Sequence, residues 1–138
     1  YASFEEELKK FSFFNSVKIK APIPHKEATK KMSEYSLLYL SLSDTTLSEG
    51  RIPLKFFEYL ATGEKIIATG KKGTDLAKLI ETLDCGYYIN YGEEDKIYEI
   101  LNIERGLLNS KLENKQYSQF SKDQQALEYV KIFNQVTQ

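Results

Sequence analysis

The segment SEGRIPLKFFEYLATGEKIIAT (residues 48–69) contains residues whose types and spacing suit the binding of an anion beside a sugar. Ile52-Pro53 opens an expected helix, and the free amides and dipole of its first turn would attract an anion at about Ile52–Lys55. Lys55 adds a mobile positive charge there. One turn later, the carboxylate of Glu58 can accept hydrogen bonds from hydroxyl groups. The diphosphate and ribose of a nucleotide require this combination; the alternative is a solvated Glu58 paired with Lys55.

Other side chains that commonly do chemistry are scarce, with one histidine, His25, and one cysteine, Cys85. Zinc sites need several such ligands, so a metal site would have to be built mainly from carboxylates. His25 follows Pro24 at an expected helix start without a Ser or Cys nucleophile beside it, which favours an exposed residue over a catalytic base. Cys85 begins an expected strand and should be a small buried residue. We therefore predict no catalytic residue, no metal and no cofactor.

Length and composition describe one globular domain. The 138 residues are 41% hydrophobic and 28% charged, which excludes disordered and collagen-like chains. A formal net charge of −1 gives no support for nucleic-acid binding. No apolar run approaches the roughly 20 residues of a membrane span. We expect a cytoplasmic protein and, because the sequence begins with Tyr1, a piece of a longer chain in which residues 1–138 form a single partial domain.

Short apolar runs alternate with amphipathic segments along the chain. Strands are expected at residues 17–20, 36–43, 65–69 and 86–90, and helices at 2–11, 25–35, 52–62, 75–82, 93–108 and 115–136. This alternation is typical of an α/β protein with a Rossmann-like parallel sheet and helices on both faces. Ligands of such sheets bind beyond the carboxyl ends of the strands. The candidate site loops are therefore 21–25, 44–53 and 70–74.

The segment Pro53–Gly63 (PLKFFEYLATG), followed by Lys65–Thr69 (KIIAT), resembles the P-x-K-x-x-E-Y-L-A-x-G-x-P-[IV]-I-A-T motif of family 4 glycosyltransferases. Ser16–Glu27 is similar to the family's N-V-x-F-x-G-x-V-P-x-x-E segment, and Ser36–Ser43 and Asp84–Ile89 resemble two later strands. The likeness covers nearly the whole chain in the family's order. It implies the C-terminal half of a retaining, GT-B-fold enzyme, with a nucleotide-diphosphate sugar as donor, of the kind used in bacterial polysaccharide biosynthesis.

The resemblance also implies roles for individual residues. Glu58 matches the glutamate that binds the ribose hydroxyls of the donor, and the amides around Pro53-Leu54, beside Lys55, match the helix start that receives the diphosphate. The turn Ala21-Pro22-Ile23 matches the turn whose backbone faces the nucleobase. Glu49 matches a second glutamate near the donor sugar, although it precedes Glu58 by nine residues rather than the family's eight and lies in a loop of different length.

The sequence departs from the family pattern at several points. Ala21 stands where Gly is usual, and Lys65 stands where Pro is common. The strand with a Gly-Arg pair and the downstream Lys that clamp the diphosphate would precede Tyr1, as would the N-terminal acceptor-binding domain. We therefore expect this portion to bind the donor and to partner the missing domain. It should contact a membrane only through that domain and transfer no sugar alone.

Two other interpretations remain open. A receiver-like or other flavodoxin-like interaction domain would place Asp44, Thr69 and Lys71 near strand ends, and a fragment without its first strands could have lost nucleotide binding.

In the family's strand order, the strand at 17–20 would have lost the neighbours that join it to the strand at 36–43. We expect it to pair directly with 36–43, or two chains to associate through the exposed sheet edge.

Overall fold

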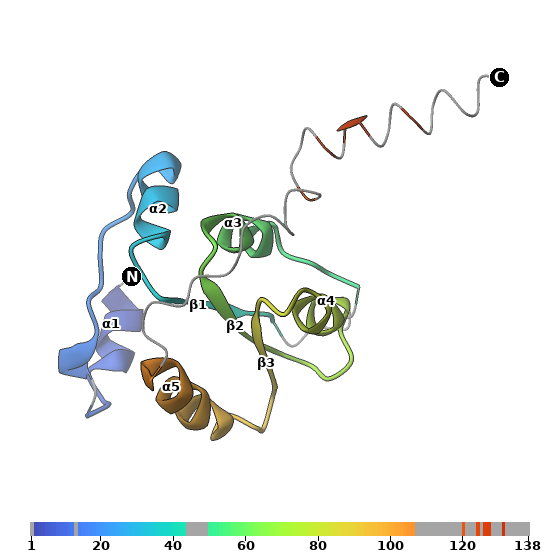
Figure 1. Cartoon of the computed structure of the whole chain (residues 1–138). Coiled ribbons are helices and arrows are strands. Elements are labelled where there is room, and N and C mark those ends of the chain that lie inside the picture. The colour runs from blue at the N-terminus through green and yellow to red at the C-terminus, as the bar shows by residue number, and fades with distance from the viewer. Residues whose placement is uncertain are drawn as a thin grey trace.

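The computed structural model of the chain describes residues 2–12, 14–43 and 50–106, together with residues 120, 124, 126, 127 and 131. Its elements are, in order, α1 (Ala2–Leu8), the short 3-10 helix η1 (Phe14–Ser16), α2 (His25–Met32), β1 (Leu37–Ser41), α3 (Leu54–Thr62), β2 (Lys65–Gly70), α4 (Asp75–Leu83), β3 (Gly86–Asn90) and α5 (Lys96–Gly106). Figure 1 shows the strands side by side with helices around them. Most of the expected elements therefore form, within a few residues of their expected bounds.

The strands form one parallel sheet in the order β1-β2-β3. Leu38 of β1 lies opposite Ile66 of β2, and Ile66 in turn lies opposite Gly86 of β3. Parallel neighbours need a crossover connection, and α3 and α4 provide the two crossovers. The predicted fold class is confirmed: the chain is an α/β protein whose three-stranded parallel sheet is flanked by helices, consistent with a Rossmann-like fold.

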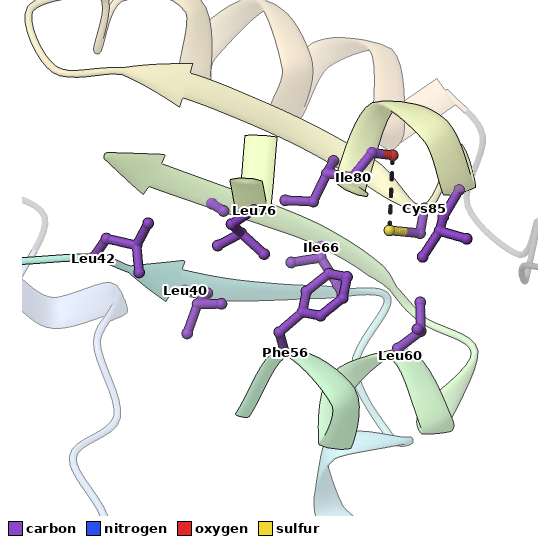
Figure 2. Packing of buried hydrophobic residues seen from close by; sticks show 10 residues of the cluster. Leu40, Leu42, Phe56, Leu60, Ile66, Leu76, Ile80 and Cys85 are labelled. Atoms are coloured by element: carbon purple, nitrogen blue, oxygen red, sulfur yellow. Dashed lines mark hydrogen bonds between the residues drawn. The ribbon is translucent and has the colours of Figure 1, made fainter. Parts of the chain in front are cut away.

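Helices cover both faces of this sheet. On one face, α3 and α4 pack over a cluster of buried residues (Figure 2), namely Leu40, Leu42, Phe56, Leu60, Ile66, Ala68, Leu76, Ile80, Leu83 and Cys85. On the other face, Ile100 of α5 packs against Ile67 and Ile89. Because side chains alternate along a strand, the neighbours Ile66 and Ile67 serve opposite faces. This double cover explains why the strand sequences are almost continuously apolar.

The strand predicted at residues 17–20 does not form. Residues 17–24 belong to no helix or strand, and Ile19 is 41% exposed. The alternation of apolar residues and lysines in this segment is a local pattern, whereas a parallel strand also needs a neighbour and a cover on each face. The predicted pairing with the strand at 36–43 is wrong for the same reason, because β1 pairs only with β2 in the part of the chain that the structure describes.

The helix predicted at 115–136 falls mostly outside the described residues. One described position within it, Phe120, packs against the α3 side of the core. Its ring centroid lies 5.7 Å from that of Phe57. This single contact is consistent with the apolar character of the segment and tests nothing more of that prediction.

A polar cluster fixes α5 to the sheet. Lys65, the first residue of β2, donates to Oε1 of Glu104 at 2.7 Å, and the Tyr87 hydroxyl donates to the same oxygen. The side chains of Lys65 and Glu104 are only 18% and 13% exposed. Burial alone would raise the pKa of Glu104, but the hydrogen bonds from Lys65 and Tyr87 lower it. The hydrogen bond to Glu104, reinforced by burial, raises the pKa of Tyr87 to about 12.

We expect this cluster to make stability fall at alkaline pH. With an ordinary pKa of 10.0 for the unfolded chain and about 12 for the folded one, the contribution of the protonated Tyr87 is complete below pH 10 and is lost as the pH rises towards 12. Tyr87→Phe should lower the free energy of unfolding by about 1–2 kcal/mol at neutral pH. It should also make that free energy fall less steeply between pH 10 and 12, which urea unfolding midpoints measured across this pH range would show. The control is Tyr98→Phe, at a residue 73% exposed; the same alkaline slope in both variants would contradict the assignment to Tyr87.

Candidate functional site

The starts of α2 and α3 lie towards the carboxyl ends of the strands. Each helix ends a few residues before a strand begins, so each points its first turn to the opposite edge of the sheet, and Figure 1 shows the two helices as neighbours. Pro24 and Pro53 are their N-caps, and neither makes a side-chain cap hydrogen bond. Proline fixes φ but offers no side-chain acceptor to the amides of the first turn. The sequence therefore builds two uncapped helix starts close together.

The start of α3 lies close to where the sequence predicted a helix to begin. The helix begins at Leu54, just after the predicted Ile52-Pro53 opening, and the amide of Phe56 donates to the carbonyl of Pro53 at 2.9 Å. The preceding amides, those of Leu54 and Lys55, are the ones available to an anion. Leu54 is 72% exposed and Lys55 is also exposed. The predicted residues Pro53, Leu54 and Lys55 thus lie together at an open, electropositive helix end.

Glu58 lies on the side of α3 that faces α2. Phe56 and Leu60 anchor the helix in the core, while Oε1 of Glu58 lies 3.0 Å from Nε2 of His25, the first residue of α2. Because an ionised carboxylate only accepts hydrogen bonds, Nε2 is the donor. The Glu58 side chain is 23% exposed and that of His25 is 74% exposed. Within the described residues the partner of Glu58 is therefore His25, rather than the Lys55 of the alternative interpretation.

His25 is the site residue that sequence reasoning missed. Its prediction as an exposed first-turn residue is confirmed, but its contact with Glu58 joins positions 33 residues apart. The only signal in the sequence was the repeated pattern of a proline directly before a helix. Helices that lead into neighbouring strands of a parallel sheet start at the same edge, so the residue after the proline in one helix could have been expected near the other helix.

The remaining predicted site residues lie in loops. Ala21, Pro22 and Ile23 are exposed and belong to no helix or strand, and they lead through Pro24 directly into α2. The chain thus places this predicted base-facing turn within a few residues of the His25–Glu58 contact. Glu49, like Asp44 of the receiver-like interpretation, lies outside the described residues.

The third candidate loop, 70–74, is occupied by structural hydrogen bonds. Thr74 is the N-cap of α4, where its hydroxyl accepts from the amide of Ala77 and donates to the Tyr88 hydroxyl at 2.9 Å. That Tyr88 hydroxyl donates to the carbonyl of Lys71 at 2.8 Å, and burial raises the pKa of Tyr88. A Cβ added at Gly70 would lie 2.3 Å from the same hydroxyl. The loop is therefore held in one shape by groups that would otherwise be free to bind a ligand.

Two depressions in the described surface are relevant to the candidate site. One, of about 480 Å³, separates α2 from the end of α3 and is lined by His25, Lys26, Thr29, Lys30, Ser33, Ala61 and Thr62. The other, of about 670 Å³, lies along β3 between α4 and α5. The first adjoins the candidate site through His25, and Lys26 adds a positive charge in the first turn of α2. The second is larger but contains none of the predicted site residues.

The structure offers little support for other chemistry. The Cys85 side chain is fully buried, its thiol lies 3.9 Å from the carbonyl oxygen of Ile80, and burial raises its pKa to about 11. The prediction of a small buried residue is confirmed. Among the described residues there is no group of three or more His, Cys, Asp or Glu side chains that could hold a metal ion. No helix in the same set has the length and apolar character needed to cross a membrane.

No protein-family model, curated protein or solved structure matches this chain. Its class is therefore defined by the fold alone, as an α/β protein with a three-stranded parallel sheet of Rossmann-like form. Within that fold, neither α2 nor α3 has a side-chain hydrogen bond at its N-cap, and a hydrogen bond joins His25, the first residue of α2, to Glu58, about one turn into α3.

Proposed function

We propose that this chain is the donor-binding portion of a retaining glycosyltransferase and that its ligand is a nucleotide-diphosphate sugar. The position of the Glu58 carboxylate carries the proposal. This carboxylate is partly exposed, lies about one helical turn beyond the uncapped start of α3, and accepts a hydrogen bond from α2. The motif from Pro53 to Gly63, with its resemblance to family 4 glycosyltransferases, supports the same ligand.

The α3 start and Glu58 suit two adjacent groups of one ligand. The amides of Leu54 and Lys55, the helix dipole and the Lys55 ammonium attract the diphosphate. Glu58 comes four residues after Leu54, or about 6 Å along the helix axis, where the hydroxyls of a ribose can donate to its carboxylate. The exposed turn Ala21-Pro22-Ile23 offers backbone groups to the base at the neighbouring helix start.

The proposed mechanism needs no nucleophile from this chain. In a retaining transfer of this kind the diphosphate departs while positive groups stabilise its developing charge, and the acceptor attacks on the same face of the sugar. The α3 start and Lys55 would supply part of that stabilisation, and Glu58 would hold the ribose. The resemblance places the acceptor in a separate domain, so the role proposed for these residues is donor binding.

Titration calorimetry with UDP, GDP and ADP tests this function. We expect heat of binding with one of the three, and we expect Glu58→Ala to weaken that binding by about 10- to 100-fold, because a hydrogen bond to a charged group contributes roughly 1.5–3 kcal/mol. Glu81→Ala removes an exposed glutamate of α4 and should leave the affinity unchanged. The proposal would be contradicted if none of the three nucleotides gave heat of binding, or if the two variants lost affinity equally.

A further inference from the structure

The hydrogen bond between His25 and Glu58 joins two side chains of very different exposure. The His25 ring is 74% exposed, whereas the Glu58 side chain is 23% exposed. An ion pair or hydrogen bond at such an open position adds little to folding stability, because water screens it and competes for both partners. The packing of α3 rests instead on Phe56 and Leu60, which are buried in the core. The contact between His25 and Glu58 is therefore not needed to hold the helices in place.

The contact does restrict the Glu58 carboxylate. A glutamate side chain has several freely rotating bonds and loses that freedom when it must present its oxygens in one direction. The histidine ring has fewer, and its backbone is held by Pro24 before it and by the Thr29 hydroxyl, which donates to the His25 carbonyl at 3.0 Å. His25 bonds to Oε1, and in the part of the chain that the structure describes no hydrogen bond reaches Oε2 of Glu58, so that atom can accept from a ligand.

We propose that His25 is a positioning residue that presents the Glu58 carboxylate to the two neighbouring hydroxyls of a ribose, an inference that rests on the proposed nucleotide binding. Oε2 accepts from one hydroxyl, and the second lone pair of Oε1 accepts from the other. A carboxylate ordered before binding has less freedom to lose when the ligand arrives. The benefit of His25 is thus specific to a ligand that carries both ribose hydroxyls.

This specificity separates a positioning role from a structural one. His25→Ala is expected to weaken binding of the ribonucleoside diphosphate by about fivefold to tenfold, and to change binding of its 2′-deoxy counterpart by less than about twofold. His25→Gln should restore most of the ribonucleotide affinity, because the amide nitrogen of glutamine can donate from nearly the same position as Nε2. The double variant His25→Ala/Glu58→Ala should bind no more weakly than Glu58→Ala alone.

The experiment titrates the whole chain with UDP, GDP and ADP, and then with the 2′-deoxy form of the nucleotide that binds. If His25→Ala weakened binding of the ribonucleotide and of its 2′-deoxy form equally, or weakened neither, the role of His25 would be overturned. Glu58 would remain the ribose ligand. Additive losses in the double variant would overturn the role of His25 too. If the unmodified chain binds no nucleotide, or if Glu58→Ala binds like it, the proposed function fails first and the inference fails with it.

Discussion

Gly86→Ala is expected to destabilise the chain by about 3–5 kcal/mol, enough to unfold a marginally stable domain. Gly86 is the first residue of β3 and has φ +154, a conformation that other residues rarely adopt. A Cβ built there would lie 1.9 Å from the carbonyl oxygen of Ile66 and 2.7 Å from its amide nitrogen. Those atoms are backbone of the central strand β2, so neither can move without breaking the β2–β3 ladder.

Gly92→Ala is the matched control for this prediction. Gly92 also has a positive φ, +86, but no described atom beyond its chain neighbours comes within 4 Å of the added Cβ. Its substitution should therefore show only the backbone cost of a left-handed residue, about 1–2 kcal/mol. Urea unfolding followed by circular dichroism measures the free energy of unfolding of the two variants. Similar losses in the two variants would mean that the close approach between Gly86 and Ile66 does not constrain the fold.

Elements whose signals are local could be predicted from the sequence. The apolar runs that became β1, β2 and β3 and the glycine that ends α3 are such signals, because covered strands and left-handed helix ends restrict composition directly. Gly63, at φ 73, is the C-cap of α3 and directly follows residue 62, where the helix was expected to end. The strand expected at 17–20 failed because pairing is not local: the same alternation of side chains has no neighbour to join.

The candidate site was predictable to a similar extent. Leu54 and Glu58 share one helix that begins directly after Pro53, so their spacing alone fixed their geometry. Leu54 lies at the open helix start and Glu58 about one turn later. The contact of Glu58 with His25 depends on how α2 lies against α3. The packing of α2 against α3 depends on the order of the strands in the sheet rather than on either helix alone. A local sequence pattern therefore does not predict it.

Phe56→Ala is expected to destabilise the chain by about 3–5 kcal/mol, as large-to-small changes of fully buried aromatic residues do. Phe56 is 0% exposed and lies in the core with Leu40 and Leu60 (Figure 2). Its ring meets that of Phe57 edge-on, with centroids 5.3 Å apart. Leu54→Ala, on the same helix at a residue 72% exposed, should change the free energy of unfolding by less than about 0.5 kcal/mol.

Because α3 carries both the core anchor and the carboxylate, stability and binding must be measured separately. Phe56→Leu keeps most of the buried volume and should cost less than about 1.5 kcal/mol, so the variant stays folded and its nucleotide affinity can be titrated. We expect that affinity to match the unmodified chain, since Phe56 faces the sheet and Glu58 faces α2. Weakened nucleotide binding by the folded Phe56→Leu variant would show that core packing sets the position of Glu58.

The stability prediction has its own contradicting outcome. If the free energy of unfolding of Phe56→Ala were close to that of Leu54→Ala, α3 would not be anchored through Phe56.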